Sequence, residues 1–168
     1  MSAMEHAYFG KLDTSAIQRS VDVIWEREFS LNGATFTVWL WASPATELDK
    51  AKLDACAALL ENMGALDATA RQALRESLAE DRSYIDFHAE EIPDSEVMQQ
   101  LLDAANDAAA ITEENFVARM KLCGIGLWHD ATSAPVVMDY MIDPDASDQI
   151  LAVKAEQDGK VTVIDWES

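Results

Sequence analysis

The chain has few basic residues, because its 168 positions include only 12 lysines and arginines against 31 aspartates and glutamates. The formal net charge is therefore -19 at pH 7. A field of this sign repels nucleic-acid phosphates and anionic lipid headgroups, so nucleic acids and membranes are not expected partners. It favours solubility, and it would attract a basic protein.

The chain also lacks a disulfide framework and a long apolar run. Its two cysteines, Cys56 and Cys123, lie far apart in apolar surroundings, which favours buried thiols in a reducing compartment. No run approaches the roughly 20 apolar residues of a membrane span, and the first residues carry no basic and apolar leader. These absences predict a cytoplasmic protein.

Catalytic and cofactor motifs are absent from the sequence as well. There is no glycine-rich phosphate loop, no Gly-x-Ser-x-Gly elbow and no His-Glu-x-x-His pair. The acidic run at 143–148 lacks the glycine and the closing glutamate of a calcium loop. The sequence therefore predicts no catalytic residue, no metal and no cofactor, and it favours a non-enzymatic protein.

Alternating polarity on both sides of Asn32-Gly33 predicts a β-hairpin with strands at about 21–31 and 34–42. A two-residue turn fixes the register and leaves one face mostly apolar. The other face combines acidic side chains with two indoles, from Glu26, Glu28, Trp39 and Trp41. These tryptophans either tuck under a neighbouring element or form a recognition surface.

The middle of the chain follows the 3.6-residue period of helices, interrupted by capping residues. A first helix is expected to end at Gly64, and a second to run to Glu91, where Pro93 stops it. The expected N-terminal caps of four helical segments are, in order, Thr46, Asp67, Asp94 or Ser95, and Thr112.

Strand-like sequence returns near the C-terminus, at about 120–128, 135–142, 149–157 and 160–166. Gly124 and Gly126 leave one side of the first of these strands bare, which predicts a bend or the close approach of a helix. Asp158-Gly159 repeats the hairpin signal. Its register sets Leu151 opposite Trp166, Val153 opposite Ile164 and Ala155 opposite Thr162.

A strand hairpin, a helical block and a strand meander together predict a single α+β domain over residues 1–168. The expected fold is an antiparallel sheet, made of the N-terminal hairpin and the C-terminal meander. A central block of three to four helices should pack on one face of it.

The densest polar cluster of the chain is centred on His88. In a helix that continues to Glu91, the side chains of Glu80, Tyr84, His88 and Glu91 share one face. Convergent nitrogen and oxygen ligands are what a metal or acid-base site requires, so this cluster is the candidate site of a metal-dependent hydrolase or other enzyme. The alternative is a helix-end histidine that hydrogen-bonds to a neighbour.

Several short sequence segments occur in a characteristic order along the chain. They are Phe9-Gly10-Lys11-Leu12, Leu31-Asn32-Gly33, Tyr84–Glu91, the run 148–154 and the final Glu167-Ser168. In these segments the chain resembles an uncharacterised bacterial family, the domain of unknown function numbered two thousand and four, over nearly its whole length. The resemblance implies a small bacterial cytoplasmic protein with no assigned activity, so no catalytic residue is carried over from it.

The charge and the missing motifs favour a binding protein that neutralises or scaffolds a basic protein, as immunity proteins of bacterial toxins do. Glu26, Glu28, Trp39 and Trp41 are the expected partner-binding residues, because opposite charges speed encounter and buried aromatic side chains hold a complex together. Formation of a homo-oligomer through a strand edge or through the Trp39 and Trp41 face is a further alternative.

Overall fold

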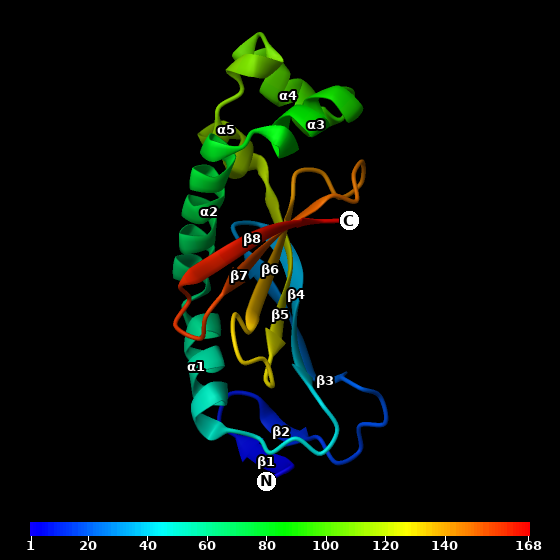
Figure 1. Cartoon of the computed structure of the whole chain (residues 1–168), viewed down its shortest axis with the longest axis vertical. Coiled ribbons are helices and arrows are strands. Elements are labelled where there is room, and N and C mark those ends of the chain that lie inside the picture. The colour runs from blue at the N-terminus through cyan, green and yellow to red at the C-terminus, as the bar shows by residue number, and fades with distance from the viewer.

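The computed structural model describes residues 1–168 and has the predicted α+β architecture, with eight strands and five α-helices (Figure 1). In chain order the elements are β1 (Ala3–His6), β2 (Gly10–Asp13), β3 (Asp22–Leu31), β4 (Ala34–Ala42), α1 (Lys50–Glu61), α2 (Met63–Glu80), α3 (Ser83–Glu91), α4 (Glu96–Ala105), the 3-10 turn η1 (Ala108–Ala110), α5 (Glu113–Arg119), β5 (Lys121–Trp128), β6 (Val136–Met141), β7 (Ile150–Ala155) and β8 (Val161–Glu167).

The N-terminal hairpin and the C-terminal meander join in one sheet of six strands, in the order β3-β4-β5-β6-β7-β8. All neighbours are antiparallel except β4 and β5, which pair in parallel. The whole helical block lies between β4 and β5 in the chain, and a parallel pair needs such a long crossover connection. A separate two-stranded sheet, β1-β2, completes the fold.

Turn chemistry sets the register of both hairpins. Asn32 and Gly33 have φ angles of 53° and 82°, and their turn pairs Phe29 with Phe36 as predicted. In the β7–β8 hairpin, the pairs Leu151–Trp166 and Val153–Ile164 are confirmed. The predicted partner of Ala155 is wrong, because an irregularity after Lys154 places Ala155 opposite Val161 instead of Thr162.

The predicted caps of the last two helices are confirmed, and those of the first two are wrong. Ser95 and Thr112 accept hydrogen bonds from the first turns of α4 and α5. Asp49, three residues after the predicted cap Thr46, caps α1 by accepting from the backbone N–H groups of Ala51 and Lys52.

Asp67 is not a cap at all, because α2 already begins at Met63 and the predicted stop Gly64 lies inside its first turn. The predicted single helix up to Glu91 is also divided. The chain leaves α2 after Glu80, and the side chain of Asp81 then accepts from the backbone N–H of Ser83 at the start of α3.

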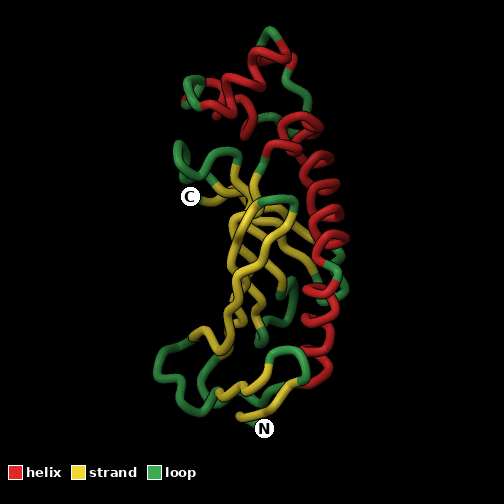
Figure 2. The backbone as a smooth tube through the Cα atoms, turned by 180° about the vertical axis from the view of Figure 1, so that it is seen from behind, coloured by secondary structure: helices red, strands yellow, loops and turns green.

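Two of the helices, α1 and α2, cover one face of the sheet. In both views α1 and α2 run along the same side of it, while α3 and α4 lie beyond one of its ends (Figures 1 and 2). The main core lies between α1, α2 and the sheet, and includes the fully buried Val38, Leu53, Leu74, Ile125 and Met138. The opposite face of the sheet carries no helix.

No helix combines the length and the apolar character that a membrane span requires. Both cysteines are free thiols: Cys56 is buried, and burial raises its pKa to about 11. Cys123 is partly buried where the β5–β6 pairing shifts register, and its pKa is also raised by burial. The prediction of a buried thiol is confirmed for Cys56, whereas Cys123 is only partly buried.

Candidate functional site

The helix-free face of the sheet, here called the open face, carries the four residues expected to bind a partner. Strand pairing extends it across the sheet, because side chains at paired positions point to the same side. Its members from β3 to β8 are Glu26, Glu28, Trp39, Trp41, Trp128, Val137, Asp139, Lys154, Val163, Asp165 and Glu167.

Three tryptophans of the open face pack on the bare side of β5. A Cβ atom added to Gly124 would lie 2.8 Å from Cζ3 of Trp39, and one added to Gly126 would lie 3.0 Å from Nε1 of Trp128. The rings of Trp41 and Trp128 stack with centroids 5.1 Å apart and planes 8° from parallel. The two glycines therefore accommodate indole rings, and the predicted approach of a helix at this strand is wrong.

All three indoles stay partly exposed. Trp39 and Trp41 therefore do not tuck under a helix: they pack against the glycines of β5 and remain partly accessible. A rigid aromatic patch of this kind offers a large contact area at a small entropic cost, because the rings are already held in place.

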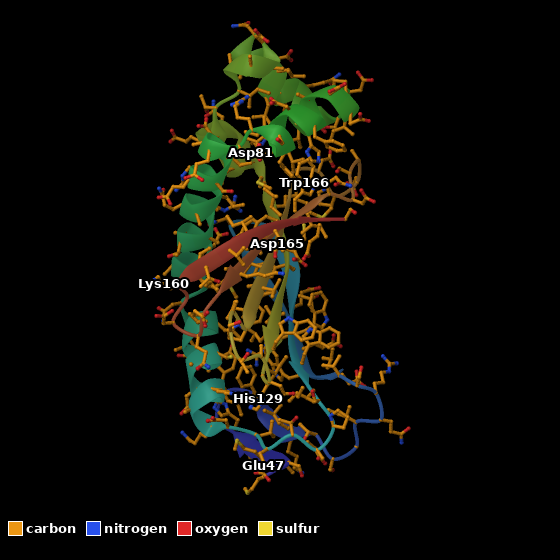
Figure 3. The ribbon with its side chains drawn as sticks, in the orientation of Figure 1. Glu47, Asp81, His129, Lys160, Asp165 and Trp166 are labelled. Atoms are coloured by element: carbon orange, nitrogen blue, oxygen red, sulfur yellow. The ribbon has the colours of Figure 1, made fainter.

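Carboxylates flank this aromatic patch on both sides. Glu26 and Glu28 are exposed on the edge strand β3. On β8, at the other edge, the carboxylates of Asp165 and Glu167 lie 2.8 Å and 3.5 Å from Nζ of Lys154. Figure 3 shows Asp165 near the middle of β8.

Asp139 lies between these two edges, on β6, and it makes no ion pair. Burial raises the pKa of its carboxyl group, and the negative charge of Glu167 raises it further. The neighbouring positions on either side, Gly124 and Ala152, carry little or no side chain. The Trp39 ring fills the space beside Gly124, whereas the small side chain of Ala152 leaves more room on the other side of the carboxylate.

The structure does not bring the four residues of the predicted polar cluster together on one helix face. Glu80 ends α2 and His88 belongs to α3, so the continuous helix that was to align them does not exist. Glu80 and Glu91 are both exposed, and neither hydrogen-bonds to His88. No group of three or more histidine, cysteine, aspartate or glutamate side chains is placed to hold a metal ion.

His88 instead fastens α3 to the loop before β7. It is fully buried, its Nδ1 donates to the carbonyl oxygen of Tyr84 at 2.8 Å, and its Nε2 accepts from the hydroxyl of Ser147 at 2.8 Å. The Tyr84 hydroxyl donates to the Gln149 carbonyl at 2.7 Å, and Trp166 packs on the Tyr84 ring from β8. The ring nitrogens of His88 and the hydroxyl of Tyr84 are therefore all hydrogen-bonded within the protein.

Burial lowers the pKa of His88, because the charged imidazolium would lose its hydration. The unfolded chain takes up the proton first, near pH 6.5, so stability should fall as the pH drops below that value. We expect the free energy of unfolding of the wild type to decline between pH 7 and pH 5 more steeply than that of a His88→Gln variant. The extra slope is limited to one proton, about 1.4 kcal/mol per pH unit.

Urea denaturation at several pH values measures both slopes. The raised pKa of Asp139 acts in the opposite sense at lower pH, but it is common to both proteins and cancels in the comparison. Parallel curves for the two proteins would show that His88 does not titrate differently in the folded and unfolded states.

Sequence reasoning placed Glu26, Glu28, Trp39 and Trp41 on one surface but missed Trp128 and Asp139. The two strands that carry the missed residues join the hairpin only through the parallel β4–β5 pair. One local signal was present: the alternation of glycines at 124 and 126 matches the alternation of tryptophans at 39 and 41.

The chain matches no family model, no curated protein and no solved structure. The resemblance to the uncharacterised bacterial family therefore stays a prediction.

Proposed function

We propose that this chain is a small acidic protein-binding module that neutralises or scaffolds a basic protein, and that the open face is its docking surface. The observation that carries the proposal is the patch of three partly exposed tryptophans on the helix-free face of the sheet, flanked by Glu26 and Glu28 on one side and Asp165 on the other. Aromatic anchors enclosed by a polar rim are typical of the energetic centres of protein interfaces.

The charge of the chain supports a basic partner over a second copy. Two copies would each bring a net charge of -19 to the same interface, and their repulsion would oppose docking. A basic protein would be steered toward this surface, and Asp139 offers an unpaired carboxylate at the centre of it. A cytoplasmic location and a bacterial source remain part of this proposal.

The enzyme alternative, with His88 acting beside Glu80 or Glu91, has less support. A catalytic base must reach substrate, whereas both ring nitrogens of His88 are engaged inside the protein and its ring is fully buried. Glu80 and Glu91 are exposed and do not hydrogen-bond to the ring.

Variants of the open face test the proposal. A tagged wild-type chain is used to capture basic proteins from the source cell, and the affinity of each purified candidate is then measured for Trp39→Ala and for Glu26→Gln/Glu28→Gln. Loss of the Trp39 indole should lower the affinity for a true partner by about 30-fold or more, through faster dissociation. Loss of the two carboxylates should slow association and reduce its dependence on salt.

The matched control is Glu90→Gln/Asp103→Asn, which removes the same charge at two exposed positions of α3 and α4. A partner that binds all three variants alike docks elsewhere, and the open-face proposal then fails. It fails as well if the wild type doubles its solution mass with concentration and Trp39→Ala/Trp41→Ala stays monomeric, because the face then pairs two copies of the chain.

A further inference from the structure

One hollow of the molecule has a charge opposite to that of the chain as a whole. It lies where α2, the start of β5 and the β3–β4 turn meet, and its volume is about 520 Å³. Four of the 12 basic residues line it, namely Arg71, Arg75, Arg119 and Lys121, and we call it the basic hollow. Asp67 is the one acidic residue among those that line it.

Asp67 cannot neutralise all four cations, because its carboxylate is already paired with Arg71. Nε of Arg71 donates to both carboxylate oxygens, at 3.1 Å and 3.0 Å, and the Tyr140 hydroxyl donates to one of them at 2.7 Å. With one carboxylate against four bases, the lining of the hollow carries a net charge of +3. Arg75, Arg119 and Lys121 are left without a carboxylate partner.

Such a cluster is unexpected in a chain with 31 carboxylates. Arg71, Arg75 and Arg119 are all partly buried, so their mutual repulsion is screened less than it would be on an open surface. Arg119 lies in the last turn of α5, where a cation stabilises the helix end. That explanation does not extend to Arg75, whose guanidinium hydrogen-bonds only to the side-chain oxygen of Gln72, or to Lys121.

Donors in the hollow remain available for a ligand. Nη1 of Arg71 donates to the backbone carbonyls of Val117 and Met120, at 2.6 Å and 3.0 Å, whereas its Nη2 makes no hydrogen bond within the protein. Guanidinium groups match the planar or tetrahedral oxygens of carboxylates and phosphates, often with two parallel bonds. The remaining walls are largely apolar and include Phe36 and Leu122.

We propose that the basic hollow binds a small organic anion that carries a phosphate or carboxylate group, with its carbon portion against the apolar wall. A small ligand fits the charge pattern better than a polyanion, because the net charge of -19 repels a long anionic chain over a wide distance. Phe36 and Leu122 are core residues on the helix-covered side of the sheet. The hollow opens beside them, so it is separate from the open face.

Titrations with inorganic phosphate, ADP and citrate at constant ionic strength test this site. Backbone amide NMR of the whole chain should show saturable shifts at Gly33, Arg75 and Arg119 for at least one probe. In Arg75→Gln/Arg119→Gln the affinity should fall by about tenfold for each lost guanidinium. Binding of phosphate and ADP without citrate assigns a phosphate ligand, and binding of citrate alone assigns a carboxylate ligand.

Arg19→Gln/Lys160→Gln is the matched control, because it removes the same charge at two exposed positions that form no ion pair. Arg71 is left unchanged in every variant, since its bonds to Asp67 and to the end of α5 support the fold. If Arg75→Gln/Arg119→Gln fails to keep the wild-type circular dichroism spectrum, Lys121→Gln replaces it, with Lys160→Gln as its control.

The proposal is overturned if none of the three probes gives a saturable response, or if both double variants bind with equal affinity. It is also overturned if the solution mass of the wild type doubles with concentration while that of Arg75→Gln/Arg119→Gln does not. In that case the acidic surface of a second copy occupies the hollow.

Discussion

Replacing Asp67 by alanine is expected to lower the free energy of unfolding by about 3–5 kcal/mol, the usual cost of removing one partner of a buried ion pair. The Asp67 carboxylate is buried and accepts from both the Arg71 guanidinium and the Tyr140 hydroxyl. Without it, the Arg71 charge loses its counter-charge, and a buried phenol loses its only hydrogen-bond acceptor. Urea denaturation followed by circular dichroism measures the loss.

Glu76→Ala is the control for Asp67→Ala. Glu76 lies on the same helix, but it is exposed and its side chain hydrogen-bonds only to that of Gln72, so its removal should change stability by about 0.5 kcal/mol or less. Equal losses for the two variants would contradict a structural role for the Asp67 network.

Local signals predicted those parts of the fold that local chemistry decides. Asn32-Gly33 specified both the β3–β4 turn and its register, because its two residues adopt the left-handed backbone that a tight hairpin requires. Ser95 and Thr112 were correct as caps, since each side chain accepts from a backbone N–H three residues ahead.

Asp67 shows why other predictions were wrong. By sequence it resembles a cap, yet its partner Tyr140 lies 73 residues further along the chain, and burial with that partner outweighs the local preference. The division between α2 and α3 had a local signal that was overlooked: the Asp81 side chain accepts from both the backbone N–H and the hydroxyl of Ser83.

The candidate site also has one part that the local sequence predicted and another part that it could not predict. The period of a strand placed Glu26, Glu28, Trp39 and Trp41 on one face, and their shared surface follows from the hairpin alone. Trp128 joins that surface only because β5 pairs in parallel with β4, and strand order across a crossover of almost 80 residues is not encoded locally. For His88 the sequence left two alternatives open, and the structure agrees with the hydrogen-bonded helix-end histidine; its partner Ser147 could not be predicted, because it comes from a loop 59 residues away.

Placing valine at Gly124 is expected to lower the free energy of unfolding by about 1–3 kcal/mol, although valine favours strands, because overpacking outweighs propensity here. A Cβ atom at this position would lie 2.8 Å from Cζ3 of Trp39, so the indole must leave its place on β5. The displaced ring would also disrupt the aromatic patch, so Gly124→Val should weaken partner binding as strongly as Trp39→Ala does. Urea denaturation and partner affinity measure the two effects.

Two further variants decide whether the Trp39 contact is the cause of the loss at Gly124. In Gly124→Val/Trp39→Ala the clash is removed. The destabilisation caused by the valine should therefore be smaller than in the wild-type background. The double-mutant cycle should give a coupling free energy of at least about 0.5 kcal/mol. Gly64→Ala is the control for glycine replacement itself: Gly64 lies in the first turn of α2 with open space around its Cα, so alanine there should stabilise the chain by up to about 1 kcal/mol. A valine at position 124 that destabilises the chain equally with and without the indole would show that Gly124 is required for another reason, and that Trp39 is not held on β5 as the structure describes.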